Sequence, residues 1–160
     1  MKKELFTTRN LCIGGIVAAL YAALTLLLAP ISYGAIQCRV SEALTLLPVL
    51  LPQSIPGLFV GCLIANIIGS GSIWDIVFGS LATLIAAIGT YAFRKNIWLA
   101  AACPVVANGL IVGAVLSFVY GLPMLLTMLE VAVGEVVACL LGIVMVKALE
   151  KTELPRRYSL

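Results

Sequence analysis

A short polar segment carries several groups that could bind a ligand. Residues 37–42, QCRVSE, place an amide (Gln37), a guanidinium (Arg39), a hydroxyl (Ser41) and a carboxylate (Glu42) close together, and long apolar runs follow and precede them. Such groups hold small polar molecules by charge-assisted hydrogen bonds. Arg39 and Glu42 are three residues apart, so an alternative is that they pair with each other. We interpret the rest of the chain as a scaffold around this segment.

Further polar residues interrupt two apolar runs near the C-terminal end: Asn108, Glu130 and Glu135. Counted as helix from the outer ends of two membrane spans, Asn108 and Glu135 lie about 17 Å deep and Glu130 about 10 Å deep. An ionisable group at such a depth is costly unless it meets protein, water or a ligand. One interpretation is that each Glu is protonated and bonded between helices. The other is that at least one faces a cavity and receives a donor-rich or cationic ligand.

The two carboxylates are not equivalent, because residues five apart on an α-helix point roughly 140° away from each other. Pro104 precedes Asn108 by one helical turn and predicts a kink that opens space there, although an ordinary membrane-helix proline has the same pattern. Asn66 and Asp75 flank a GSGS turn, and plain helix capping is an alternative role for Asp75.

The composition indicates an all-α integral membrane protein with a single domain, since 62% of residues are hydrophobic and 11% charged, against about one quarter charged in soluble domains. We predict a bundle of six transmembrane helices, of which the second and third are short. The predicted segments are about 11–29, 40–51, 56–68, 73–93, 97–119 and 124–150.

Basic residues predict the orientation of these segments. They gather before the first segment, between the fourth and fifth, and after the sixth: Lys2, Lys3, Arg9, Arg94, Lys95, Lys147, Lys151, Arg156 and Arg157. With six crossings all three groups lie on one side, which the positive-inside rule makes the cytoplasm. Both termini are therefore predicted to be cytoplasmic, and the segment around Arg39 is predicted to lie at the outer side.

Small residues form two rows on the first predicted span. Gly14, Ala18 and Ala22 are spaced by four, and so are Gly15, Ala19 and Ala23. Rows of this kind let another helix backbone approach closely. The rows fit packing within the bundle, and they also fit a docking surface for another membrane subunit.

The sequence lacks the motifs of several functional classes. The chain has no His and its five Cys are scattered, so we expect no metal site and no cofactor. There is no GxxxxGK[ST] loop and no nucleophile–base pair, so we expect neither an ATPase nor another enzyme. Paired repeats of the kind common in secondary transporters are not evident. These features favour a subunit that captures a solute and relies on partners for transport.

Three strings resemble the QueT family: GAIQCRVSEALTLLPVLLPQSIPGLFVGCLIAN (34–66), WDIVFGSLATL (74–84) and VGEVVACLLG (133–142). QueT proteins are substrate-capturing S components of energy-coupling-factor (ECF) transporters. The resemblance implies a six-helix protein of a prokaryotic plasma membrane that captures a queuosine precursor at its outer face. The candidates are queuine, 7-cyano-7-deazaguanine and 7-aminomethyl-7-deazaguanine. A transmembrane T subunit and two ATP-binding-cassette (ABC) ATPases would drive uptake, with the T subunit docked on the small-residue rows.

A deazaguanine suggests roles for the polar residues. Glu135 could accept from N1–H and the 2-amino group, and Asn108 could read O6. Glu130 or Asp75 could meet an aminomethyl cation. The remaining candidates would stack on the ring, close the site or complete its hydrogen bonds: Tyr33, Trp74, Tyr120, Gln37, Arg39, Glu42 and Asn66. The alternatives are an S component for another vitamin or heterocycle, a stand-alone carrier coupled to protons through Glu135, and an assembly subunit without a ligand.

Overall fold

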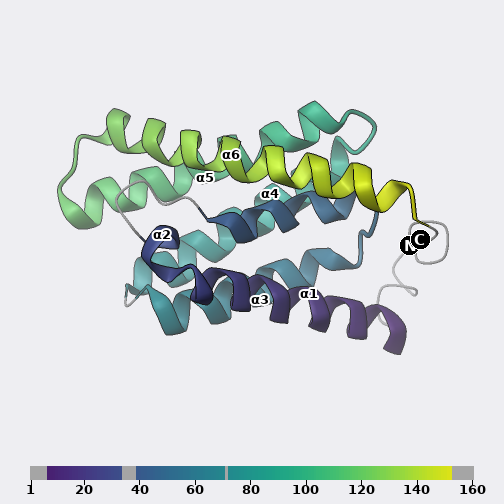
Figure 1. Cartoon of the computed structure of the whole chain (residues 1–160). Helices are drawn as coiled ribbons and strands as arrows, with labels where there is room; N and C mark the ends of the chain where they lie inside the picture. The colour runs from purple at the N-terminus through teal and green to yellow at the C-terminus, as the bar shows by residue number, and fades with distance from the viewer. Residues whose placement is uncertain (1–6, 34–38, 71, 153–160) are drawn as a thin grey trace.

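A computed structural model describes residues 7–33, 39–70 and 72–152, and every regular element in these residues is helical. Figure 1 shows long helices arranged side by side. In chain order the elements are α1 (Thr8–Leu27), α2 (Ala29–Ser32), the 3₁₀ helix η1 (Val40–Val49), α3 (Ser54–Gly69), the π-helix η2 (Asp75–Gly79), α4 (Ser80–Ala92), α5 (Ile97–Tyr120) and α6 (Met124–Glu150).

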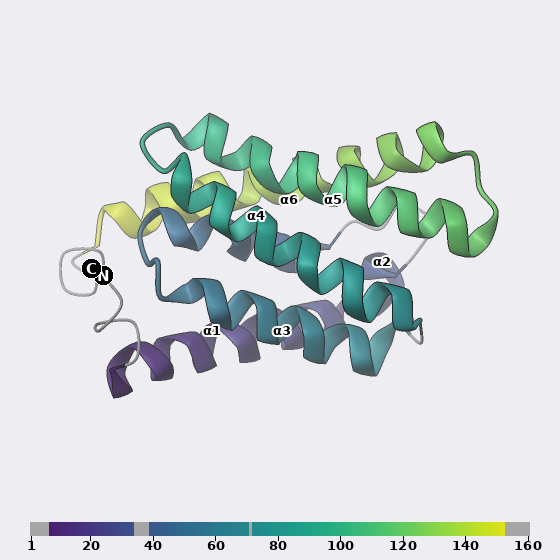
Figure 2. The same ribbon diagram turned by 180° about the vertical axis from the view of Figure 1, so that it is seen from behind.

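The helix η1 lies at the centre of the bundle. The α1–α3 pair packs below it and the α5–α6 pair above it in Figure 1, and α4 connects the two pairs by contacting both α3 and α5 (Figures 1 and 2). All five of these helices contact η1. The helix that carries Ser41 and Glu42 of the polar segment is therefore surrounded by the rest of the fold.

The period of η1 explains why it suits this central place. In a 3₁₀ helix, side chains three residues apart eclipse one another. Leu44 and Leu47 form one such row, which packs into the apolar cluster of α1 and α3. Leu46, on another row, packs against Cys139 and Ile143 of α6. Ten residues at a rise of about 2.0 Å cover only about 20 Å, less than the hydrocarbon core of a bilayer.

Glycines bring α1 and α3 into backbone contact. A Cβ atom on Gly57 would lie 2.2 Å from the Gly14 carbonyl oxygen, and one on Gly61 would lie 2.7 Å from that of Ala18. The row of Gly14, Ala18 and Ala22 is thus buried inside the chain's own bundle, whereas Gly15, Ala19 and Ala23 are exposed. Packing within the bundle accounts for the first row, and the docking prediction remains open for the second.

Four helical stretches are long and apolar enough to cross a membrane: Thr8–Leu27, Asp75–Ala92, Ile97–Tyr120 and Met124–Glu150. η1 and α3 are shorter apolar helices. The helical class and the two short segments agree with the sequence prediction, and the last helix has the predicted bounds. Six crossings stay a prediction.

Two details of the chain differ from the predicted segments. The first long helix ends at Leu27 and a separate turn, α2, contains Pro30, because proline is accommodated in the first turn of a helix. Ile31 and Ser32 belong to this turn. The fourth segment opens with the π-turn η2, which widens the helix before α4 begins.

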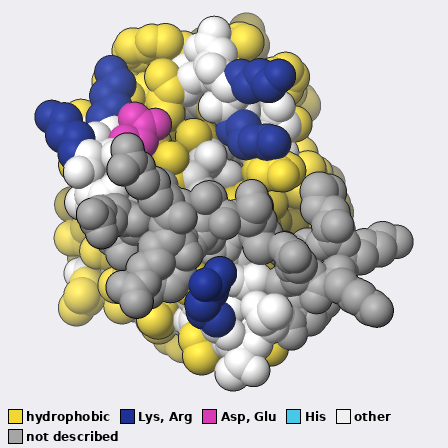
Figure 3. Space-filling model, turned by 90° about the vertical axis from the view of Figure 1, so that its right-hand side faces the viewer, with side chains coloured by type: hydrophobic (Ala, Val, Ile, Leu, Met, Phe, Trp, Pro, Cys, Tyr) yellow, Lys and Arg dark blue, Asp and Glu magenta, His cyan; other side chains and the backbone are white. Residues whose placement is uncertain are grey.

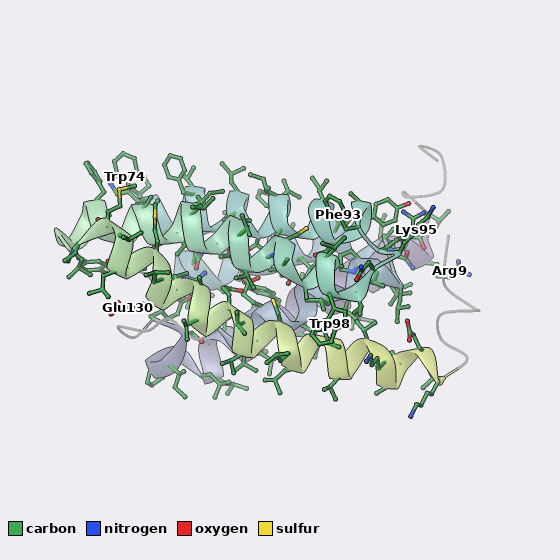
Figure 4. All side chains as sticks on the ribbon, turned by 90° about the horizontal axis from the view of Figure 1, so that it is seen from above. Arg9, Trp74, Phe93, Lys95, Trp98 and Glu130 are labelled. Carbon is green, nitrogen blue, oxygen red and sulfur yellow. The ribbon has the colours of Figure 1, made fainter. Side chains whose placement is uncertain are left out.

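The described basic residues of the orientation argument lie at one end of the bundle, while Lys2, Lys3, Arg156 and Arg157 lie outside the described residues. Arg9 is in the first turn of α1, Arg94 and Lys95 are in the α4–α5 turn, and Lys147 is in the last turn of α6. Figure 3 views this end and shows the Lys and Arg side chains gathered on it, and Figure 4 places Arg9 and Lys95 there. Their common position is the arrangement that the orientation argument requires, while the identity of that side remains a prediction.

Candidate ligand-binding site

Glu42 is the best-anchored carboxylate of the interior. It lies on η1 with 1% of its surface exposed. The Tyr21 hydroxyl of α1 donates to Glu42 Oε1, and the Thr83 hydroxyl of α4 donates to the same atom at 3.1 Å. Glu42 Oε2 has no hydrogen-bond partner. Two neighbouring helices therefore fix this carboxylate through one oxygen and leave the other available.

Glu135 of α6 and Asn108 of α5 lie beside Glu42. They are 3% and 2% exposed. The Asn108 amide lies close to both the Glu42 and Glu135 carboxyl groups, yet neither of its polar atoms forms a hydrogen bond of good geometry. Glu135 also accepts no hydrogen bond within the described parts of the chain, and its Oε2 is fully buried. Buried polar groups are normally satisfied, so these atoms are candidates for hydrogen bonds to a bound ligand.

Close packing of α5 and α6 brings Asn108 and Glu135 to the same level. A Cβ atom on Gly113 would lie 2.6 Å from the Met128 Cα atom, and one on Gly109 would lie 3.2 Å from the Ala132 Cβ atom. Small residues at helix interfaces allow this approach in membranes. The equal depth estimated from sequence agrees with this neighbouring placement.

Arg39 forms a second part of the cluster. Its Nε donates to the Ser32 carbonyl at 3.4 Å, and its guanidinium lies 5.3 Å from the centre of the Tyr33 ring. The Tyr33 hydroxyl donates to the Ala65 carbonyl at 2.7 Å, which fixes the ring. Within the described residues Arg39 forms no ion pair with Glu42, and its Nη2 is buried without a partner. The pairing alternative is therefore not realised.

Asn66 and Asp75 complete this second part. Asn66 Nδ2 donates to the Asp75 carbonyl at 3.0 Å. Asp75 is 4% exposed, lies in the π-turn η2, and is near enough to Arg39 for their charges to interact. No side chain caps this turn, so the capping role is not what the structure shows for Asp75. π-turns of this kind are frequent at functional sites.

Three of the predicted site residues lie apart from the cluster. Trp74 stacks on Phe78 at 5.8 Å and is 46% exposed, and Tyr120 is 61% exposed. Glu130 is half-buried on α6, and Figure 4 shows Trp74 and Glu130 at the end opposite Lys95. Gln37 lies outside the described residues. The structure therefore joins Glu135, Asn108, Glu42, Arg39, Asn66, Asp75 and Tyr33, and it separates Glu130, Trp74 and Tyr120 from them.

Sequence reasoning missed the hydroxyl groups around Glu42. Besides Tyr21 and Thr83, Thr25 Oγ1 donates to the Tyr21 carbonyl at 2.8 Å and lies 2.7 Å from Ser41 Oγ, whose hydroxyl can donate to it. Tyr21 and Thr25 are four residues apart beside the buried small-residue row, a spacing that places them on one face. Thr83 had no such signal, since hydroxyl side chains in membrane helices commonly bond their own backbone.

Comparison with known proteins decides the family. The model of the QueT transporter family matches residues 11–151. The chain belongs to the QueT transporter family. It is also 37% identical over 98 residues to the queuosine precursor transporter QueT of Lactococcus lactis subsp. cremoris (strain MG1363), which covers 59% of this chain and 56% of that protein. This chain thus aligns with little more than half of that relative. No solved structure matches the chain.

Membership of this family agrees with the helical architecture. A member of a transporter family with four helices long and apolar enough to cross a bilayer is a multi-pass membrane protein. The relatives are transporters rather than enzymes. In this setting the buried polar cluster is the natural candidate for the site that recognises the transported molecule, because ionisable groups inside a membrane bundle commonly mark a substrate path.

Proposed function

We propose that this QueT-family protein is the S component of an ECF-type importer and that it captures a queuosine precursor. The observation that carries the proposal is the neighbouring pair of Glu135 and Asn108, both buried, in which Glu135 Oε2 and both amide atoms of Asn108 have no hydrogen bond of good geometry within the described residues. Burying polar groups without good hydrogen bonds costs free energy of folding. A bound ligand that hydrogen-bonds to these groups removes that cost. The name of the related queuosine precursor transporter supports a chemical class for that ligand.

A 7-deazaguanine matches the two side chains. Its N1–H and 2-amino group present two parallel donors, and a carboxylate accepts both in a bidentate arrangement. Glu135 Oε2 is buried without a hydrogen-bond partner in the described residues, so we assign this edge of the ligand to Glu135. The adjacent O6 is an acceptor, and the Asn108 amide nitrogen can donate to it. The buried setting strengthens each of these hydrogen bonds.

The second part of the cluster closes the site towards the membrane surface. Arg39, Tyr33, Asn66 and Asp75 lie near the start of the long stretch Asp75–Ala92. Trp74, the residue before this stretch, lies at the end of the bundle opposite Lys95 (Figure 4). With six crossings and the basic end in the cytoplasm, this end faces the outside of the cell. Tyr33 and Arg39 supply flat groups against which a heterocycle can stack.

The energy for transport would come from partner subunits, namely a transmembrane T subunit and two ABC ATPases in a prokaryotic plasma membrane. The sequence carries no phosphate-binding loop of its own. Gly15, Ala19 and Ala23 form an exposed small-residue row on α1, and the space next to Gly15 is open. We assign this row to docking on the T subunit, since it is the part of the α1 small-residue face that the bundle leaves uncovered.

Purification and uptake together test this role. Tagged protein expressed in its native host should co-purify with a T subunit and ABC ATPases, and uptake of labelled precursor into proteoliposomes should require that complex and internal ATP. Uptake by the isolated chain driven by a proton gradient would instead establish a stand-alone carrier and contradict the proposal.

A further inference from the structure

We propose that Glu42 selects ligands whose 7-substituent is a cation, so the transported bases carry an aminomethyl group, bare or substituted, rather than a cyano group. This inference rests on the proposed binding of a deazaguanine at Glu135 and Asn108. It adds a third contact, to a residue on a different helix, and it divides the candidate precursors by charge.

The first support is that the Asn108 amide is close to both the Glu42 and the Glu135 carboxyl groups. Around the rim of a 7-deazaguanine, O6 stands between the N1 and 2-amino donors on one side and the substituent on C7 on the other. With Glu135 on the donor edge and Asn108 on O6, the 7-substituent points towards Glu42.

The second support is the number of open oxygens on each carboxylate. Glu135 accepts no hydrogen bond from the described residues, so it can receive two parallel donors. Glu42 has Oε1 occupied by Tyr21 and Thr83, and only Oε2 is open. A single open oxygen suits one ammonium group better than a two-donor edge, which sets the direction of the ligand in the site.

The third support is the charge balance of the cluster. Three carboxyl groups face it, from Glu42 on η1, Asp75 on η2 and Glu135 on α6, against one guanidinium, Arg39. Arg39 is held by the Ser32 carbonyl and the Tyr33 ring rather than by Glu42. Adjacent buried carboxylates repel each other when ionised. A cationic substituent beside Glu42 relieves that repulsion, whereas a cyano group, which is only an acceptor, faces an acceptor.

A titration of the purified, detergent-solubilised full chain tests the proposal. The probes are 7-aminomethyl-7-deazaguanine, its neutral near-isostere 7-hydroxymethyl-7-deazaguanine, and 7-cyano-7-deazaguanine. The wild-type protein should bind the aminomethyl base at least about tenfold more tightly than the hydroxymethyl base, because the ammonium group adds attraction between opposite charges to its hydrogen bond with the carboxylate. Equal affinities for these two bases would overturn the proposal without any variant.

Two variants locate the selectivity. Glu42→Gln should reduce the ratio of the two affinities to about twofold or less, because it weakens binding of the aminomethyl base much more than binding of the hydroxymethyl base. Glu135→Gln should weaken both bases by the same factor and preserve the ratio. An unchanged ratio in Glu42→Gln, with the fold verified by thermal unfolding, would overturn the role of Glu42 but leave the proposed function intact. Failure of all three bases to bind folded wild-type protein would overturn both.

Discussion

The centre around η1 and the rim around Trp74 contain the same kinds of side chain. Those in the centre are buried, whereas those at the rim are half-buried or exposed. Glu135 in the centre is 3% exposed and accepts no hydrogen bond from described residues. Glu130, five residues earlier on the same helix α6, is half-buried near the rim. The comparison teaches that helical phase and depth, rather than residue type, decide which polar groups can meet a ligand.

The largest effect is expected where the centre depends on close helix packing. A Cβ atom on Gly61 would lie 2.9 Å from the Tyr21 Cβ atom, so Gly61→Val displaces the residue that anchors Glu42. We expect a loss of about 3 kcal/mol in unfolding free energy, as for overpacked cores. Gly15→Val, on the exposed row of the same helix pair, is the matched control and should stay within about 0.5 kcal/mol. Thermal unfolding in detergent measures both, and equal melting temperatures would contradict the assigned packing.

The next effect compares the two carboxylates of α6. Glu135→Gln replaces an acceptor by a donor that faces the ligand's donors, so the dissociation constant for a deazaguanine should rise by about 30-fold. Glu130→Gln should leave it within about twofold, because Glu130 lies outside the cluster. Isothermal titration calorimetry distinguishes these cases. Glu135→Gln binding within twofold of wild type would remove Glu135 from the site.

A smaller effect on ligand affinity is expected for Asn108, the uncharged side chain beside Glu42 and Glu135. Asn108→Ala removes the donor proposed for O6 and should weaken binding about tenfold. Tyr120→Ala changes an exposed aromatic residue of the rim and should leave the affinity unchanged, because the structure separates Tyr120 from the cluster. The opposite ranking of these two variants in the same titration would place the ligand at the rim instead of the centre.

The smallest effect concerns the hydroxyl groups that orient Glu42. Tyr21→Phe removes one of the two donors to Oε1, and Thr83 still holds that oxygen. We expect a loss of roughly 1 kcal/mol in stability and a change of only about threefold in affinity. Tyr91→Phe, near the basic end of α4, serves as the control. A Tyr21→Phe protein that loses all binding would show that Tyr21 contacts the ligand directly.

Sequence reasoning predicted much of the fold because its signals are local. Apolar run length and the prolines and glycines between runs predicted the helices, and the charges grouped Arg9, Arg94, Lys95 and Lys147 at one end. The 3₁₀ form of η1 and the π-turn at Asp75 were missed, because both depend on packing against neighbouring helices rather than on residue preference.

The site was predicted only in part, for a related reason. Depth and helix phase placed Asn108 and Glu135 together and separated Glu135 from Glu130. The same reasoning had no information on rotation of the helix ends, so Trp74 and Tyr120 were grouped with the cluster although both are exposed. The contribution of Tyr21 and Thr83 required the position of η1 between α1 and α4.

Direct binding to the purified protein without partners tests the central claim. The detergent-solubilised chain is titrated with queuine and with the cyano and aminomethyl deazaguanines, with guanine and riboflavin as controls. Our account predicts tight, saturable binding of the bases with a cationic 7-substituent, weaker binding of the cyano base, and none of riboflavin. A folded protein that binds no deazaguanine would contradict the account of the buried cluster as the capture site.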